Sequence, residues 1–204
     1  MGKDDHIKDS SPPGADRLAA AARTASKKGP PPVHLWNPPF SGDLDMRIAR
    51  DGTWFYLGSP IGRKPLVKLF SSILKREGDD YFLVTPVEKC GITVEDAPFV
   101  AIDFHVDNPG SDQSVTLITH VDDEVTAGPD HPLRVTMDAE TGEPAPYVMV
   151  RAGLEALIDR KSFYRLVEIA TEHVVDGDAQ FGIWSGGVFF PFIPAADLPE
   201  LQDR

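Results

Sequence analysis

Two stretches of this chain repeat one pattern, and that repeat constrains the fold more than any other feature. Ile61–Phe70 and Ile158–Val167 each place an Arg-Lys pair before apolar residues at helical spacing. A glycine follows each stretch (Gly78, Gly177), and an aromatic segment typical of a strand comes next. One helix with a few strands buries too little apolar surface alone, so two such units must bury a core together. Coincidence is the alternative, because basic residues near helix starts are common.

The repeat predicts an α+β fold class, with two lobes from a duplicated strand–helix–strand unit and mostly antiparallel sheets. We expect a disordered leader over residues 1–32, an N-terminal α+β lobe over 33–98 and a C-terminal α+β lobe over 99–204. The leader is polar and rich in proline, and its alanine patch at residues 18–25 is too short for a stable isolated helix. The chain has 204 residues, 41% of them hydrophobic, which is enough for a real core.

Alternating apolar residues predict the hairpins. Asp51-Gly52 suits a turn between strands at residues 45–49 and 53–57. A second, longer hairpin is expected to pair Val106 with Val115, which would place His120 opposite Ala101.

Two helices are predicted from the repeat. The first begins near Pro65 and is expected to close at Gly78. The second runs from Phe163 to His173, with Ser162 as its N-cap.

Composition restricts the protein's partners and location. The formal net charge of −12 repels a phosphate backbone, so broad nucleic-acid binding is not expected. Cys90 is the single cysteine, which rules out an intramolecular disulfide and indicates a reducing compartment. We find neither a secretory signal nor an apolar run long enough to span a membrane, so a cytoplasmic location is predicted.

The repeated cations suggest an anion site. Arg63-Lys64 and Arg160-Lys161 lie at the starts of the two predicted helices, where cations oppose the helix dipole at a cost of a few tenths to ~1 kcal/mol. A helix N-terminus with basic neighbours can bind an anion, and arginine suits planar anionic groups. The alternative is that these cations simply pair with the abundant acidic side chains.

The sequence resembles a bacterial family known as domain of unknown function 1285. The resemblance covers residues 35–192 and is carried by these runs in order: Asp51–Trp54, Gly58–Ile61 with Arg63, Leu83–Lys89, Ile92–Phe99, Arg151–Ala156 and Gly182–Ser185. It implies a two-lobed α+β fold whose second lobe is superficially similar to pleckstrin-homology-like domains. It also implies a ligand site at the lobe interface for a nucleotide-like molecule, a signalling role and no enzymatic activity.

The first functional hypothesis is a non-enzymatic ligand-binding or regulatory protein with a small anionic, nucleotide-like ligand between its lobes. Arginines would contact the charge, a tryptophan would stack on a ring, and polar side chains would orient the ligand. The candidate residues are Trp54, Arg63, Thr85, Glu88, Glu95, Arg151, Arg160, Trp184 and Ser185. We predict no catalytic residue, no metal and no cofactor.

Two alternatives remain open: a hydrolase using Glu88, Glu95 or Asp96, and a protein-interaction module that uses the second lobe or the leader. A buried structural role is favoured for Cys90 over that of a nucleophile.

A metal site is the minor interpretation of a polar strand face. Asp103, His105 and Asp107 alternate along one strand, and His120 lies on the next. A solvated sheet face explains these residues equally well.

Overall fold

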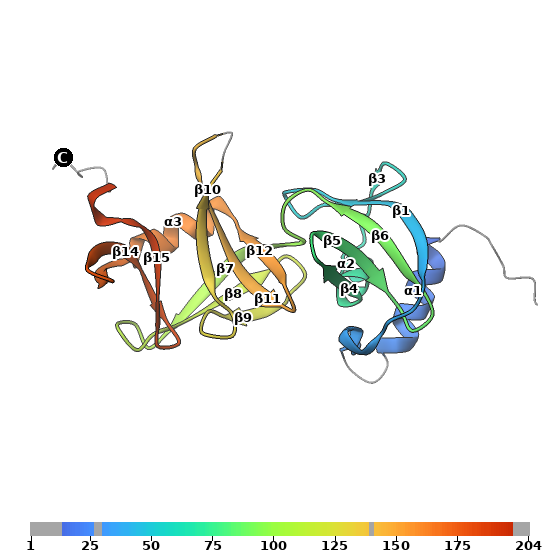
Figure 1. The fold of residues 1–204 in the computed structure, drawn as a ribbon, viewed down its shortest axis with the longest axis horizontal. Helices are drawn as coiled ribbons and strands as arrows, with labels where there is room; N and C mark the ends of the chain where they lie inside the picture. The colour runs from blue at the N-terminus through green and yellow to red at the C-terminus, as the bar shows by residue number, and fades with distance from the viewer. Residues whose placement is uncertain (1–13, 27–29, 139–140, 198–204) are drawn as a thin grey trace, which may run out of the picture. The chain divides into compact units, whose positions relative to one another are not determined.

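The computed structural model describes residues 14–26, 30–138 and 141–197. The chain divides into two compact units (Figure 1). Unit 1 comprises Met1–Arg47 and Trp54–Thr93, and unit 2 comprises Ile48–Thr53 and Val94–Arg204. Each unit combines helix with mainly antiparallel sheet, so the predicted α+β class with two lobes is confirmed. The hairpin tip Ile48–Thr53 belongs to unit 2, although it lies within the residue range 33–98 predicted for the N-terminal lobe.

Unit 1 is built on a six-stranded sheet with the order β3-β2-β1-β6-β5-β4. Its elements are α1 (Ala15–Ala25), η2 (Val33–Leu35), β1 (Phe40–Ile48), β2 (Trp54–Tyr56), β3 (Ser59–Pro60), α2 (Lys64–Ser72), β4 (Leu74–Glu77), β5 (Asp80–Val84) and β6 (Lys89–Val94). The Asp51-Gly52 hairpin forms as predicted, with Ala49 N–H donating to the Thr53 carbonyl at 2.9 Å.

The core of unit 1 is centred on an aromatic pair. Trp54 of β2 is only 1% exposed and stacks on Phe70 of α2, with ring centroids 6.2 Å apart and planes 16° apart. Met46 and Leu83 are buried as well. The apolar stripe predicted for α2 therefore packs against the sheet.

The N-terminal segment differs from the predicted disordered leader. Ala15–Ala25 forms helix α1, which packs against α2 and buries Leu18, Ala19 and Ala22. Arg17 forms an ion pair with Glu88 of the same unit. A short helix is marginal in isolation, but packing of its apolar face supplies the missing stability. Residues 1–13 and 27–29 lie outside the described residues.

The predicted repeat has a local counterpart in each unit, although both helices are shorter than expected. In unit 1, α2 ends at Ser72, and β4 and β5 form a hairpin around Gly78 (φ +65°). Gly78 therefore turns a hairpin instead of ending the helix, because its positive φ suits a tight turn.

In unit 2 the same order recurs. Helix α3 (Arg160–Glu168) is followed by β13 (Thr171–Val175) and β14 (Asp178–Ser185), which are joined at Gly177 (φ +95°). The prediction that this helix extends to His173 is wrong for the same reason. The sheets differ, since β4 and β5 belong to six strands and β13 and β14 to three.

Unit 2 contains two sheets. The larger has the order β10-β11-β12-β7-β8-β9, and β12 and β7 are its parallel pair (Figure 1). The smaller has the order β13-β14-β15. The remaining elements are β7 (Phe99–Asp107), β8 (Ser114–Thr119), β9 (Glu124–Thr126), β10 (Leu133–Met137), β11 (Pro144–Arg151), β12 (Leu154–Ile158), β15 (Val188–Pro194) and η3 (Ala195–Asp197).

The β7–β8 hairpin has the predicted register next to its turn. Val106 lies opposite Val115. Ala101 lies opposite Thr119, so the prediction that His120 occupies that position is wrong. The pairing shifts by one residue between Ala101 and Asp103, as a β-bulge does.

Helix α3 begins earlier than predicted, and its cap differs. Asp159 is the N-cap, and its carboxylate accepts the Ser162 backbone N–H at 2.7 Å. Ser162 itself is buried in the first turn. The helix packs Phe163 against Phe192 of β15, with ring centroids 5.3 Å apart.

No helix among the described residues has the length and apolar character needed to cross a membrane.

Candidate functional site

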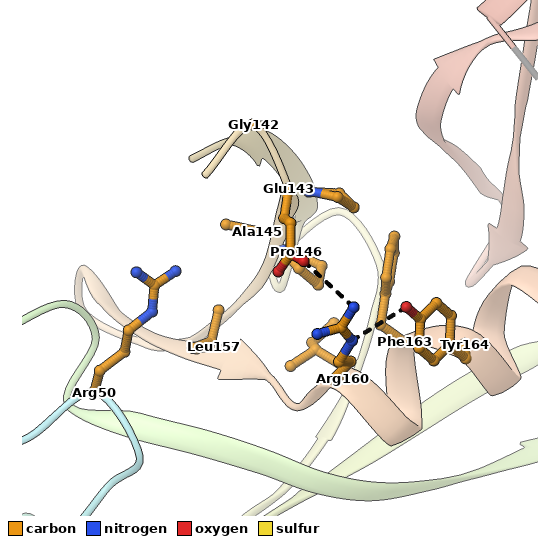
Figure 2. Close-up of a pocket in the computed structure, with 11 residues that line it drawn as sticks. Arg50, Gly142, Glu143, Ala145, Pro146, Leu157, Arg160, Phe163 and Tyr164 are labelled. Atoms are coloured by element: carbon orange, nitrogen blue, oxygen red, sulfur yellow. Dashed lines mark hydrogen bonds and ion pairs between the residues drawn. The ribbon is translucent and has the colours of Figure 1, made fainter. Parts of the chain in front are cut away.

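An open pocket in unit 2 lies where the loop before β11, strand β12 and the start of α3 meet. Its volume is about 430 Å³, within the usual range for small-ligand sites. Figure 2 shows Arg160 and Glu143 beside one another, with Tyr164 on one side and Arg50 on the other. We call this cavity the Arg160 pocket.

Arg160 is positioned by the helix start. It is the first residue of α3, directly after the Asp159 N-cap. Its Nε donates to the Tyr164 hydroxyl at 3.1 Å, and its Nη2 lies 3.3 Å from Glu143 Oε1. These contacts raise the pKa of Arg160, with the Tyr164 bond as the larger cause. The side chain is 70% exposed, so a permanently charged guanidinium faces the pocket and solvent.

Arg50 provides a second guanidinium from the turn after β1. Its Nη1 lies 2.8 Å from Asp138 Oδ2, and its Nε lies 3.3 Å from Asp96 Oδ2. The hydrogen bond to Asp138 is the main cause that raises the pKa of Arg50. Two carboxylates therefore hold this side chain in place, and Arg50 is pre-oriented more firmly than Arg160.

The rest of the wall is mostly apolar. Pro146, Leu157, Phe163 and the ring of Tyr164 line the pocket. Glu143 is the carboxylate among the described lining residues. The pocket thus combines two cations with flat apolar surfaces, an arrangement suited to an anion that carries a ring.

A buried tyrosine supports the Arg50 side of the pocket. The Tyr147 hydroxyl donates to Asp96 Oδ1 at 2.8 Å, and Asp96 also pairs with Arg50. The guanidinium of Arg134 lies 4.3 Å from the Tyr147 ring centroid. Burial, followed by the hydrogen bond to Asp96, raises the pKa of Tyr147 to about 12.

This shift predicts a loss of stability in alkali that depends on Tyr147. An unfolded tyrosine titrates near ~10. The stabilisation is therefore complete below that pH and is lost as pH rises toward the folded pKa of about 12. Two units of pKa correspond to roughly 2–3 kcal/mol. We expect Tyr147→Phe to show a shallower fall in unfolding free energy, measured by urea denaturation between about pH 9 and 12. Equal slopes for Tyr147→Phe and the parent protein would contradict this role.

Of the candidate ligand-binding residues in unit 1, three are buried and Arg63 is exposed. Trp54 is buried against Phe70. Thr85 is buried, and its Oγ1 accepts the Glu88 N–H at 3.2 Å in a tight turn. Glu88 is buried and pairs with Arg17. Arg63 is exposed at the N-cap of α2. Ligand contacts by these residues remain predictions.

The other predicted residues lie in unit 2, and the structure brings only Arg160 into the pocket wall. Glu95 lies next to it, since its Oε2 accepts the Arg50 backbone N–H at 3.1 Å. Arg151 pairs with Asp123 at 2.6 Å. Trp184 lines a different cavity.

Ser185 ties three segments of unit 2 together. It is fully buried. Its Oγ accepts the Val115 N–H at 2.9 Å and donates to the Ala127 carbonyl at 2.7 Å. These bonds satisfy the hydroxyl within the fold, and a ligand contact by Ser185 stays a prediction.

Sequence reasoning missed Arg50, Glu143, Phe163 and Tyr164. Tyr164 could have been found, because it lies four residues after Arg160 and so shares its helix face. Arg50 could not, because no local pattern connects a hairpin turn with a helix that begins 110 positions later in the numbering.

Cys90, the single cysteine, is buried in unit 1. Burial raises the pKa of the Cys90 thiol to about 11, which disfavours the thiolate nucleophile. Among the residues that the structure describes, no group of three His, Cys, Asp or Glu side chains is placed to hold a metal ion.

These features define a class: a two-lobed α+β protein whose second lobe has an open pocket lined by two arginines and a glutamate. The chain belongs to the DUF1285 family. Residues 31–97 match the domain of unknown function (DUF1285), N-terminal domain, and residues 98–192 match the protein of unknown function (DUF1285), C-terminal domain.

Two solved structures of this family are similar to the chain. A DUF1285 family protein from Silicibacter pomeroyi DSS-3 has 61% sequence identity and a TM-score of 0.81, over 89% of this chain and 97% of that one. A DUF1285 family protein from Shewanella baltica OS155 has 29% identity and a TM-score of 0.49, over 62% of this chain and 92% of that one. No curated protein gives a significant match.

Proposed function

We propose that this protein is a non-enzymatic regulatory or signalling protein that binds a small anionic, nucleotide-like ligand in the Arg160 pocket. The observation that carries the proposal is the pair of guanidiniums, Arg50 and Arg160, at one cavity with aromatic and apolar walls. The ligand class follows from this pairing of charge with flat surface.

Arg160 is the side chain that a ligand would engage directly. Its present partner, Glu143, is 58% exposed and lies 3.3 Å away. Exposed ion pairs of this kind contribute little to stability, so an incoming phosphate or carboxylate can replace the contact at small cost.

The wall composition favours binding over catalysis. Guanidinium groups stay protonated in proteins, so Arg50 and Arg160 supply positive charge and hydrogen bonds instead of exchanging protons. The ring of Tyr164, which is exposed, lies beside Arg160 in the same pocket and offers a surface for a planar group (Figure 2).

A thermal-shift screen with nucleoside monophosphates and small carboxylates tests the proposal. A ligand that binds the folded state raises its stability, by about 2.7 kcal/mol at a concentration one hundred times its Kd. We then expect Arg160→Ala to weaken binding of the strongest hit by roughly tenfold to one-hundredfold, measured by calorimetry.

Arg165→Ala is the matched control. Arg165 lies on the same helix but pairs with Asp103 and is not part of the pocket wall. It should leave the Kd within about twofold, since it changes the net charge by the same amount without touching the site. A flat thermal response to every anion, or equal losses in both variants, would overturn the proposal.

A further inference from the structure

Strand β13 forms an open edge of the smaller sheet in unit 2. The sheet order is β13-β14-β15, so among the described residues β13 pairs with β14 alone. Its first four residues, Thr171–Val174, are exposed, and Val174 is 60% exposed. An edge strand presents unpaired backbone N–H and C=O groups, and an exposed apolar residue on it favours pairing with another strand.

The backbone of this edge is oriented for pairing. Asp176 and Gly177 form a two-residue turn, and Val175 pairs with Asp178 across it. In such a hairpin the closing pair is hydrogen-bonded, and bonded positions alternate along the strand. His173 and Thr171 therefore face β14, while the peptide groups of Glu172 and Val174 face outward.

Other described edges carry features that discourage pairing, and β13 has few of them. Strand β4 has charged side chains at Lys75, Arg76 and Glu77. Strands β3 and β9 have only two and three residues. β13 has five residues, with neither proline nor lysine. Strand β15 contains two prolines, and β10, which also has five residues without proline or lysine, contacts β15. Edge strands are usually protected by shortening, charge, proline or covering, and β13 has little of this protection.

The charge around β13 selects the partner. Between residues 168 and 178 the chain has four acidic residues and no lysine or arginine. The acidic residues are Glu168, Glu172, Asp176 and Asp178. Like charge repels a second acidic copy of this chain, and positive side chains on a partner would be attracted.

A second cavity beside the start of β13 adds a side-chain site. Its volume is about 490 Å³, and Ile169, Thr171, Trp184 and Val106 lie in its wall. No charged side chain is present among its described lining residues. We call it the Trp184 groove.

The Trp184 groove is held in shape by Gln113. The Gln113 Nε2 donates to the Trp184 carbonyl at 2.8 Å, and its Oε1 accepts the Gly110 N–H at 3.4 Å. The ring centroid of His173, in β13, lies 4.8 Å from that of the indole of Trp184. Because Thr171 lines the groove and is the first residue of β13, the groove adjoins the start of that strand.

From these observations we propose that β13 is a docking edge for an extended, basic peptide segment of a partner protein. The segment pairs with the outward peptide groups of Glu172 and Val174. Its lysine or arginine side chains meet the surrounding carboxylates, and one apolar side chain enters the Trp184 groove. Main-chain bonds then supply affinity and the groove supplies selectivity, as in other strand-addition complexes. This surface is distinct from the Arg160 pocket.

The test uses the full chain and a defined peptide of nine residues that alternates lysine with valine and has phenylalanine at its centre. Binding is followed by amide chemical shifts in NMR titrations. We expect shifts concentrated at Glu172, Val174 and Trp184. A peptide of the same sequence, N-methylated at alternate residues, keeps its charge but loses strand pairing, and should bind at least tenfold more weakly.

Two protein variants complete the design. Val174→Pro removes an outward N–H, which edge strands tolerate, so the β13–β14 pairing should survive. Ile169→Asp places a charge in the groove. Each should weaken the peptide at least tenfold while the thermal midpoint stays near that of the parent protein.

Three outcomes would overturn the proposal. The first is no binding at millimolar peptide. The second is that the methylated peptide binds as tightly as the unmodified one and that the folded variants bind the unmodified peptide as tightly as the parent protein does. That result would indicate charge attraction alone. The third is a concentration-dependent dimer whose shifts map to β13, because a second copy would then occupy the edge.

Discussion

Trp54→Ala is expected to lower the unfolding free energy by about 3–5 kcal/mol, the usual cost of removing a buried aromatic side chain. Trp54 is 1% exposed and stacks on Phe70, so alanine leaves a cavity between β2 and α2. Urea unfolding followed by far-ultraviolet circular dichroism measures the change, since fluorescence would lose one of the three tryptophans.

Phe55→Ala is the control for this prediction. Phe55 is the next residue in β2 and is only partly buried, with Arg47 lying 4.2 Å from its ring centroid. Its loss should cost less than about 2 kcal/mol, because neighbouring strand residues point to opposite faces and only one face is the core. A similar small loss for Trp54→Ala would show that the indole is dispensable to packing and would favour the ligand-stacking role predicted from sequence.

Gly182→Ala is expected to destabilise unit 2 by roughly 3 kcal/mol or more, at or beyond the upper end for overpacking. A Cβ at this position would lie 2.1 Å from the Phe190 carbonyl oxygen and 2.8 Å from the Pro191 Cα. Both are backbone atoms of β15, so no side-chain rotation relieves the clash and the strands must separate. The site lies beside the register shift between Phe181 and Gly182, where the backbones approach closely.

Gly128→Ala provides the matched comparison within the same unit. The nearest atoms to its added Cβ lie 4.0 Å away. Gly128 is buried, but the added methyl group makes only ordinary van der Waals contact there, so the change in stability should be much smaller than for Gly182→Ala. The difference in urea midpoint between the two variants measures the close approach of β14 and β15. Equal midpoints would show that this approach is absent in solution.

The local elements that sequence predicted best are those specified by neighbouring residues. The Asp51-Gly52 hairpin and the Val106–Val115 pairing formed as expected. Turn residues and alternation act over a few positions, so they can be read directly. The helix ends were misplaced because Leu74–Glu77 and Thr171–Val175 continue helical patterns in sequence but pair as strands with β5 and β14.

The candidate site was predictable only in part. Arg160 was found because an unusual cation at a helix start is visible in sequence. Its cavity was not, because Arg50 and Glu143 reach it from separate segments. Ser185 shows the reverse case, since a polar residue in a glycine-rich turn suggested ligand contact but bonds instead to Val115 and Ala127.

The amino-acid sequence alone determined the α+β class, the two lobes and the family, because periodicity, turns and motif order are local or collinear properties. Tertiary structure decided the rest. It converted the alanine patch at Leu18–Ala22 into a packed helix, buried Trp54 and placed Arg50 and Arg160 in the wall of one pocket. Those outcomes depend on packing and ion-pair interactions between segments that are distant in sequence, and no single stretch of the chain specifies such interactions.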